Sequence, residues 1–124
     1  MTAFATASPA TYKRQSIMTA PPERLVVMLY DGAIRFFVQA AAAMREDARV
    51  TASERLDRGE AIVDHLLVTL DMSAGEIAER LEGIYVFSKR LLLEARMERD
   101  ADKVDVVCAY LSELRESWAQ IAGA

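Results

Sequence analysis

The sequence PERLVVMLYDGAIRFF, residues 22–37, decides the fold of this chain because it is apolar around most of a helical circumference. On a helix that turns by about 100° per residue, four polar side chains share one narrow stripe: Arg24, Asp31, Arg35 and Gln39. A helix that is apolar on its other sides must be covered by neighbouring elements. We therefore predict a central helix that begins at Pro22, a residue suited to a first turn, and that places Phe36 on its most buried face.

The composition is that of one acidic globular domain. The chain has 124 residues, of which 52% are apolar and 27% charged, and its formal net charge is −4. This balance argues against a nucleic-acid-binding protein, which needs a basic face. The first 20 residues lack the charged and apolar regions of a secretory signal, and no run of about 18 apolar residues predicts a membrane span. With a single cysteine, Cys108, these features predict a cytoplasmic protein without membrane insertion.

Two capping boxes predict where the middle helices begin, because a Ser or Thr and a Glu three residues later satisfy each other's backbone N–H groups. The boxes are Thr51 with Glu54 and Ser73 with Glu76. We expect the first of these helices to end near residue 72 and the second to run to about residue 98. Asp100 is expected to cap the last helix.

Apolar residues repeat at helical spacing in all three segments. The predicted stripes are Leu56, Gly59, Val63, Leu66 and Leu70; Ile77, Leu81, Ile84, Ser88, Leu91 and Ala95; and Val104, Val107, Leu111, Leu114, Trp118 and Ile121. Four helices of about 20 residues joined by short connections predict an all-α, antiparallel up-and-down four-helix bundle. The bundle is expected over residues 21–122, preceded by an irregular N-terminal arm, residues 1–20.

The residues of enzyme chemistry are scarce. The only histidine, His65, lies opposite the apolar stripe of its helix, and a di-metal bundle would need a Glu-x-x-His pair on each of two helices. Cys108 has no histidine to activate it and is expected to be a buried, inert thiol. No glycine-rich phosphate loop or Ser-His-Asp set can be assembled. We therefore predict no catalytic site, no metal and no cofactor.

Several apolar residues fall outside the predicted core faces. Val86 and Leu93 are seven residues apart and point nearly opposite the core direction of their helix, with Met97 nearby, while Val106 and Tyr110 lie beside the stripe of the last helix. Isolated apolar residues are ordinary on protein surfaces. Rows on consecutive helices can instead form a groove for the apolar face of a partner helix.

The motifs of the chain, taken in order, resemble the FliS family of flagellin export chaperones. Tyr12 and Ile17 precede PPERLVVMLYDGAIRF, which is similar to that family's Pro-Glu-x-Leu start and Leu-Tyr-Asp-Gly-Ala signature. Four later segments also match the family: DMSAGEIA at 71–78, LEGIY at 81–85, LLLEA at 91–95 and LSELRESW at 111–118. The resemblance covers residues 12–120.

The resemblance implies a non-enzymatic export chaperone that binds the C-terminal segment of flagellin, prevents its premature polymerisation and aids its type III secretion. It also implies contact with the flagellar export apparatus. The client-binding residues expected from the off-core rows and the arm are Tyr12, Ile17, Val86, Leu93, Met97, Val106 and Tyr110. Tyr12 and Ile17 are expected to lie over the groove until the client displaces them.

Two readings of another class stay open from the residues alone. The off-core rows could join copies of this chain, so that the protein would be a structural bundle subunit in a homo-oligomer. Exchange of the arm between two copies would give a homodimer, whereas the chaperone reading also allows a monomer. An enzyme with an unrecognised site is the third reading, and the lack of assembled catalytic groups speaks against it.

Overall fold

The computed structural model describes residues 22–121, and the described part consists of four long α-helices and one short turn of 3₁₀-helix. The elements are α2 (Pro22–Arg45), α3 (Arg49–Val68), η1 (Met72–Ala74), α4 (Glu76–Glu98) and α5 (Ala101–Ile121). The predictions for Tyr12 and Ile17 lie outside the described residues. The predicted all-α four-helix bundle is confirmed.

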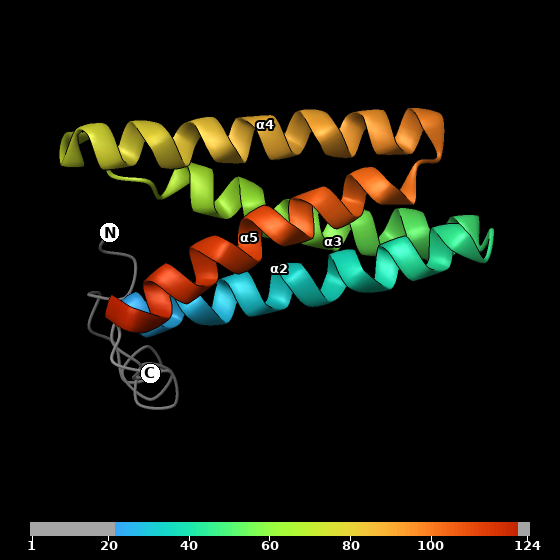
Figure 1. Ribbon diagram of the computed structural model, residues 1–124, viewed down its shortest axis with the longest axis horizontal. Helices are drawn as coiled ribbons and strands as arrows, with labels where there is room; N and C mark the ends of the chain where they lie inside the picture. Colours follow the sequence, from blue (N-terminus) through green and yellow to red (C-terminus); the bar gives the residue numbers. More distant parts are fainter. Residues whose placement is uncertain (1–21, 122–124) are drawn as a thin grey trace, which may run out of the picture.

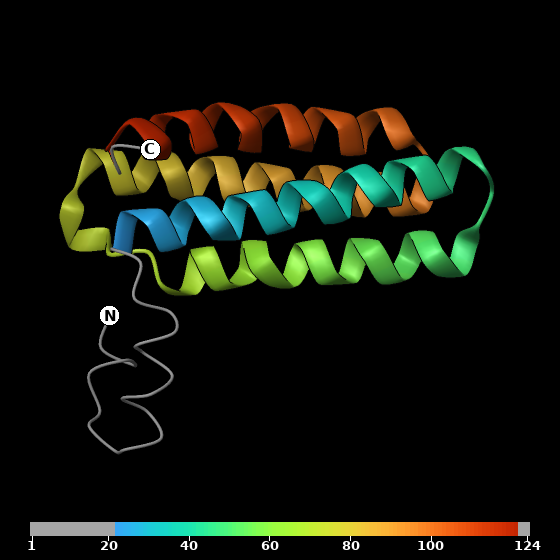
Figure 2. The same cartoon turned by 90° about the horizontal axis from the view of Figure 1, so that it is seen from below.

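Consecutive helices run antiparallel and lie side by side (Figures 1 and 2). The α2–α3 turn and the α4–α5 turn share one end of the bundle, while the connection through η1 crosses the other end (Figure 1). The closest packing joins α2 to α3 and α2 to α5, whereas α3 and α4 approach each other least among neighbours. The helix predicted to be central is therefore the one against which two neighbours pack most tightly.

The buried face of α2 is displaced from the predicted one. Phe37 is fully buried, whereas Phe36 is only half-buried, so the prediction that Phe36 lies on the most buried face is wrong. Consecutive residues point about 100° apart on a helix, and the direction between α3 and α5 is that of Phe37. The position of α3 permits this, because the Phe37 ring lies directly over Gly59.

A pair of tyrosines joins the two helices that lie diagonally across the bundle. Tyr30 of α2 and Tyr85 of α4 are buried, and their hydroxyls are hydrogen-bonded to each other. Burial raises the pKa of both phenols above the ordinary value of about 10. Both groups are therefore neutral at physiological pH, so a hydrogen bond satisfies two hydroxyls that water cannot reach.

Both predicted capping boxes are wrong. The helix α3 begins at Arg49, after an Ala48 that has no capping side chain, so Thr51 lies within its first turns. The carboxylate of Asp71 accepts hydrogen bonds from the backbone N–H and the hydroxyl of Ser73, and Asp71 is thereby the N-cap of the 3₁₀-turn. Ser73 is thus used locally, and α4 starts only after Gly75, whose φ of 80° favours glycine.

The end of α4 at Glu98 agrees with the prediction, whereas α3 ends at Val68 and not near residue 72, because residues 72–74 form the separate turn η1. Asp100 accepts a hydrogen bond from the N–H of Asp102 at 3.0 Å, which confirms it as the cap of α5. The core also contains most of the predicted stripe residues of α3 and α5: Leu56, Gly59, Val63, Leu66, Val104, Val107 and Leu111. Ile77 is an exception at 70% exposed, because the first turn of α4 lies at the end of the bundle (Figure 1).

By length and hydropathy alone, one helix in the described part, α2 over Glu23–Arg45, could cross a membrane. Its place between α3 and α5 gives another reason for that composition, since the central helix of a bundle must present apolar residues to two neighbours.

Candidate functional site

An apolar row runs along the outer face of α4. Val86 is 48% exposed, Leu93 56% and Met97 76%. Intervals of seven and four residues place the three side chains on one helical face, away from the buried Tyr85 and Leu92 of the same helix. We call Val86, Leu93 and Met97 the outer row. A helix that packs along this face would cover all three.

A second apolar patch lies between α4 and α5. The rings of Phe87 and Tyr110 pack edge to face with centroids 5.8 Å apart, and Val106 lies one turn before Tyr110 on the exposed side of α5. We call Phe87, Val106 and Tyr110 the seam patch. Phe87 is not among the site residues predicted from the sequence, because its partner Tyr110 lies on another helix.

The structure separates the predicted site residues into these two groups. Residues 86 and 87 point about 100° apart around α4, so the outer row and the seam patch face different directions. Val106 and Tyr110 therefore join Phe87, and they do not share a single groove with Val86 and Leu93. A partner that contacts both groups must follow the surface around α4.

Ion pairs fix α4 against α5 beside the seam patch. Lys103 Nζ lies 2.7 Å from Glu94 Oε1 and 3.0 Å from Glu98 Oε1. Hydrogen bonds to Glu94 and Glu98 raise the pKa of Lys103 to about 12. The lysine therefore stays charged throughout the physiological range and links α5 to two carboxylates of α4.

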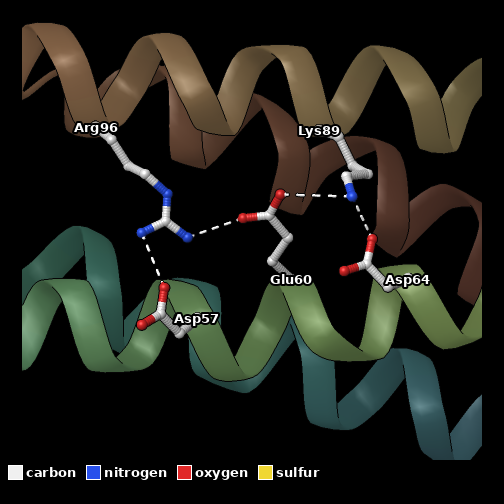
Figure 3. A network of polar contacts seen from close by, with 5 residues as sticks. All are labelled: Asp57, Glu60, Asp64, Lys89 and Arg96. Carbon is white, nitrogen blue, oxygen red and sulfur yellow. Dashed lines mark hydrogen bonds and ion pairs between the residues drawn. The ribbon is translucent and has the colours of Figure 1, made fainter.

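A ladder of ion pairs joins α4 to α3 on the side of α4 opposite α5 (Figure 3). Arg96 of α4 reaches Asp57 and Glu60 of α3 at 3.0 and 2.8 Å. Lys89 lies 3.8 Å from Glu60 and pairs with Asp64, whose hydrogen bond raises the pKa of the lysine. The ladder bridges the two neighbouring helices that pack least closely. It also gives the outer row a charged border on its α3 side, since Lys89 and Arg96 follow Val86 and Leu93 by three residues.

The groups that might carry other chemistry are dispersed. Within residues 22–121, no three His, Cys, Asp or Glu side chains are placed to hold a metal ion. His65 is exposed, as predicted. Cys108 is half-buried, and burial raises the pKa of its thiol to about 11, so the thiol stays protonated at neutral pH. A protonated thiol is a poor nucleophile.

Comparison with known proteins gives one consistent family. The model of the family described as "Flagellar protein FliS" matches residues 5–124. The chain is 35% identical over 109 residues to the flagellar secretion chaperone FliS of Salmonella typhimurium, which covers 86% of this chain and 81% of that protein. It is 30% identical to the protein of the same name from Bacillus subtilis, over 88% of this chain and 81% of the relative. It is 31% identical to the protein of the same name from Campylobacter jejuni, over 89% of this chain and 87% of the relative.

Proposed function

Because this chain belongs to the FliS family of flagellar secretion chaperones, we propose that its client is flagellin and that it binds the C-terminal segment of that protein in the cytoplasm. Bound in this way, the segment could not polymerise before export, and the complex would be delivered to the flagellar export apparatus. The family is one of chaperones and not an enzyme class.

The outer row is the observation that carries this proposal. Recognition of an amphipathic helix depends on apolar anchors at intervals of three, four and seven residues. Val86, Leu93 and Met97 offer anchors at matching intervals on a rigid helix. The charged border on the α3 side, where Lys89 and Arg96 pair with Asp57, Glu60 and Asp64, favours a client helix that turns its polar face to that side.

The seam patch supports a client that wraps around α4. A disordered segment loses conformational freedom when it folds on its partner, so it needs a large contact surface to reach useful affinity. The outer row alone is one helical stripe. With Phe87, Val106 and Tyr110 as a second contact on the other side of α4, the client could place successive short helices on two faces.

We expect Val86→Asp together with Leu93→Asp to weaken binding of the flagellin C-terminal segment by more than about tenfold, a loss of at least about 1.4 kcal/mol. Both side chains are exposed, so the bundle should keep its helical signal and melting temperature. The affinity is measured by adding each variant to a fluorescently labelled segment and recording the fluorescence anisotropy at each step.

A matched control uses two other exposed valines. Val50 and Val68 of α3 are 85% and 83% exposed and lie outside both apolar patches. The double variant Val50→Asp with Val68→Asp therefore adds the same negative charge away from the proposed client surface. This control should bind the segment normally. Equal affinity of the outer-row variant and the control would place the client elsewhere on the bundle.

The N-terminal arm provides the next prediction. We propose that Tyr12 and Ile17 cover the client surface until the client displaces them, since a tethered segment competes at high effective concentration. Removal of residues 1–18 should then raise the affinity for the segment and make the free protein more prone to self-association. Weaker binding by the truncated protein would instead make the arm part of the binding site.

A structural homo-oligomer remains the second candidate, and the same exposed patches favour it. A pull-down from the lysate of the source cells separates the two functions, because the chaperone retains a flagellin-sized client and the oligomer retains only itself. Light scattering on the purified chain would show whether it is a monomer or an arm-exchanged dimer.

A further inference from the structure

A cavity of about 230 Å³ is lined by residues near one end of the bundle. The α2–α3 and α4–α5 turns both lie at this end (Figure 1). The inner wall of the cavity is apolar and comes from Met44, Ala52 and Leu56, the last two buried. Sites for drug-sized molecules usually enclose about 300–1,000 Å³, so this cavity suits a single apolar side chain better than a cofactor.

Three arginines line the mouth of the cavity: Arg49, Arg96 and Arg99. Arg96 is engaged by the ladder to α3, and Arg49 contacts Asp47, the one carboxylate among the lining residues, at 3.2 Å. Among residues 22–121, Arg99 forms no ion pair. Carboxylates therefore already neutralise Arg49 and Arg96, and Arg99 is the cation at the mouth that is left to bind an anion.

The backbone at Arg99 adds an independent observation. This residue directly follows α4 and is its C-cap. It has φ 55° and ψ 46°, in the left-handed region where glycine is the usual choice. A non-glycine residue held in this conformation at a cavity suggests that its side chain has a use there. A neighbouring hollow, which Arg99 also lines, contains Glu98, Asp100 and Asp102 together with Arg45, which pairs with Asp102 at 2.8 Å. Carboxylates outnumber cations there, so an anion is favoured on the side of Arg99 that faces Arg49.

We propose that this cavity binds the carboxyl-terminal residue of a polypeptide. An apolar side chain would rest on Met44, Ala52 and Leu56, while the α-carboxylate of the same residue would accept hydrogen bonds from the guanidinium groups of Arg99 and Arg49. An inorganic anion would leave the apolar wall uncovered, and an uncharged apolar group would leave Arg99 without a partner. A terminal residue carries both groups on one carbon atom and fits both.

The site also gives a bound client a direction. The outer row ends at Met97, next to Arg96 in the last turn of α4. A segment that lies on the row and places its last residue in the cavity must run parallel to α4. This inference deepens the proposed function and rests on it only for the identity of the natural ligand, because the cavity itself can be tested with a minimal probe.

The probe is the peptide acetyl-Ser-Gly-Ser-Leu, prepared with a free carboxylate and, separately, as its carboxyl-terminal amide. Methyl NMR of the full chain follows the signals of Met44 and Ala52 during titration. We expect the free acid to shift these signals and to bind at least about tenfold more tightly than the amide, since charge-assisted hydrogen bonds are stronger than neutral ones. Arg99→Gln should abolish this preference, and Arg90→Gln, on an exposed part of α4 outside the cavity, should preserve it.

A second variant separates binding from folding. Arg99→Gly removes the guanidinium but suits the left-handed backbone, so it should keep or raise the melting temperature while it loses the preference for the free acid. The proposal is overturned if acid and amide shift the methyl signals equally, if neither shifts them, or if either Arg99 variant keeps the preference. The Arg99 variants leave Val86 and Leu93 unchanged, so this test and that of the Val86 and Leu93 variant can fail independently.

Discussion

Phe37→Ala is expected to lower the free energy of unfolding by about 3–5 kcal/mol, the range for removal of a buried aromatic side chain. Phe37 is fully buried within the core cluster that joins α2 to its neighbours, so its removal leaves a cavity in addition to the lost transfer free energy. Small domains have about 5–15 kcal/mol in total. We therefore expect the variant to lose most of its soluble yield, and urea denaturation of the remainder measures the change.

The adjacent phenylalanine is the control. Phe36 is half-buried, so Phe36→Ala should cost clearly less than Phe37→Ala in the same urea titration. The two variants remove the same atoms from neighbouring positions on one helix, which leaves burial as the main difference between them. If Phe36→Ala were the more destabilising change, the rotation of α2 about its own axis would be wrong.

Gly59→Val is expected to destabilise the bundle by about 3 kcal/mol, the upper part of the range for overpacking a core. A Cβ atom built on Gly59 would lie 2.5 Å from Cε1 of Phe37 and 2.7 Å from its Cζ. The ring is enclosed and cannot move aside without shifting α2 or α3. Glycine within a helix normally costs up to about 1 kcal/mol relative to alanine, so its presence here reflects close packing and not helix stability.

Two further variants test this explanation. Gly83 of α4 is exposed and has no atom within 4 Å of a built Cβ, so Gly83→Val should change the stability by less than about 0.5 kcal/mol. In Phe37→Ala combined with Gly59→Val, the valine can occupy space that the ring has left. The combined loss should therefore be smaller than the sum of the two single losses, and strict additivity would show that the two residues do not share the same space.

The sequence determined most of the architecture. Apolar stripes with a period near 3.6 showed which faces of α3 and α5 are buried, because these segments have one apolar side and one polar side. The same periodicity in α4 identified Val86 and Leu93 as surface residues. Asp100 was recognisable as a cap because its hydrogen bond joins residues two apart in the chain. Such features depend on local periodicity and local contacts, which a sequence contains directly.

Only the tertiary structure decided the rotation of α2, the partners of the surface aromatics and the cavity beside Arg99. A helix that is apolar on nearly all sides has no single preferred inner face, so the positions of α3 and α5 decide that Phe37 and not Phe36 is enclosed. The edge-to-face pair of Phe87 and Tyr110, and the approach of Arg49 to Arg99, likewise join residues on different helices. The periodicity of a single helix cannot predict these contacts, because they depend on how the helices pack against one another.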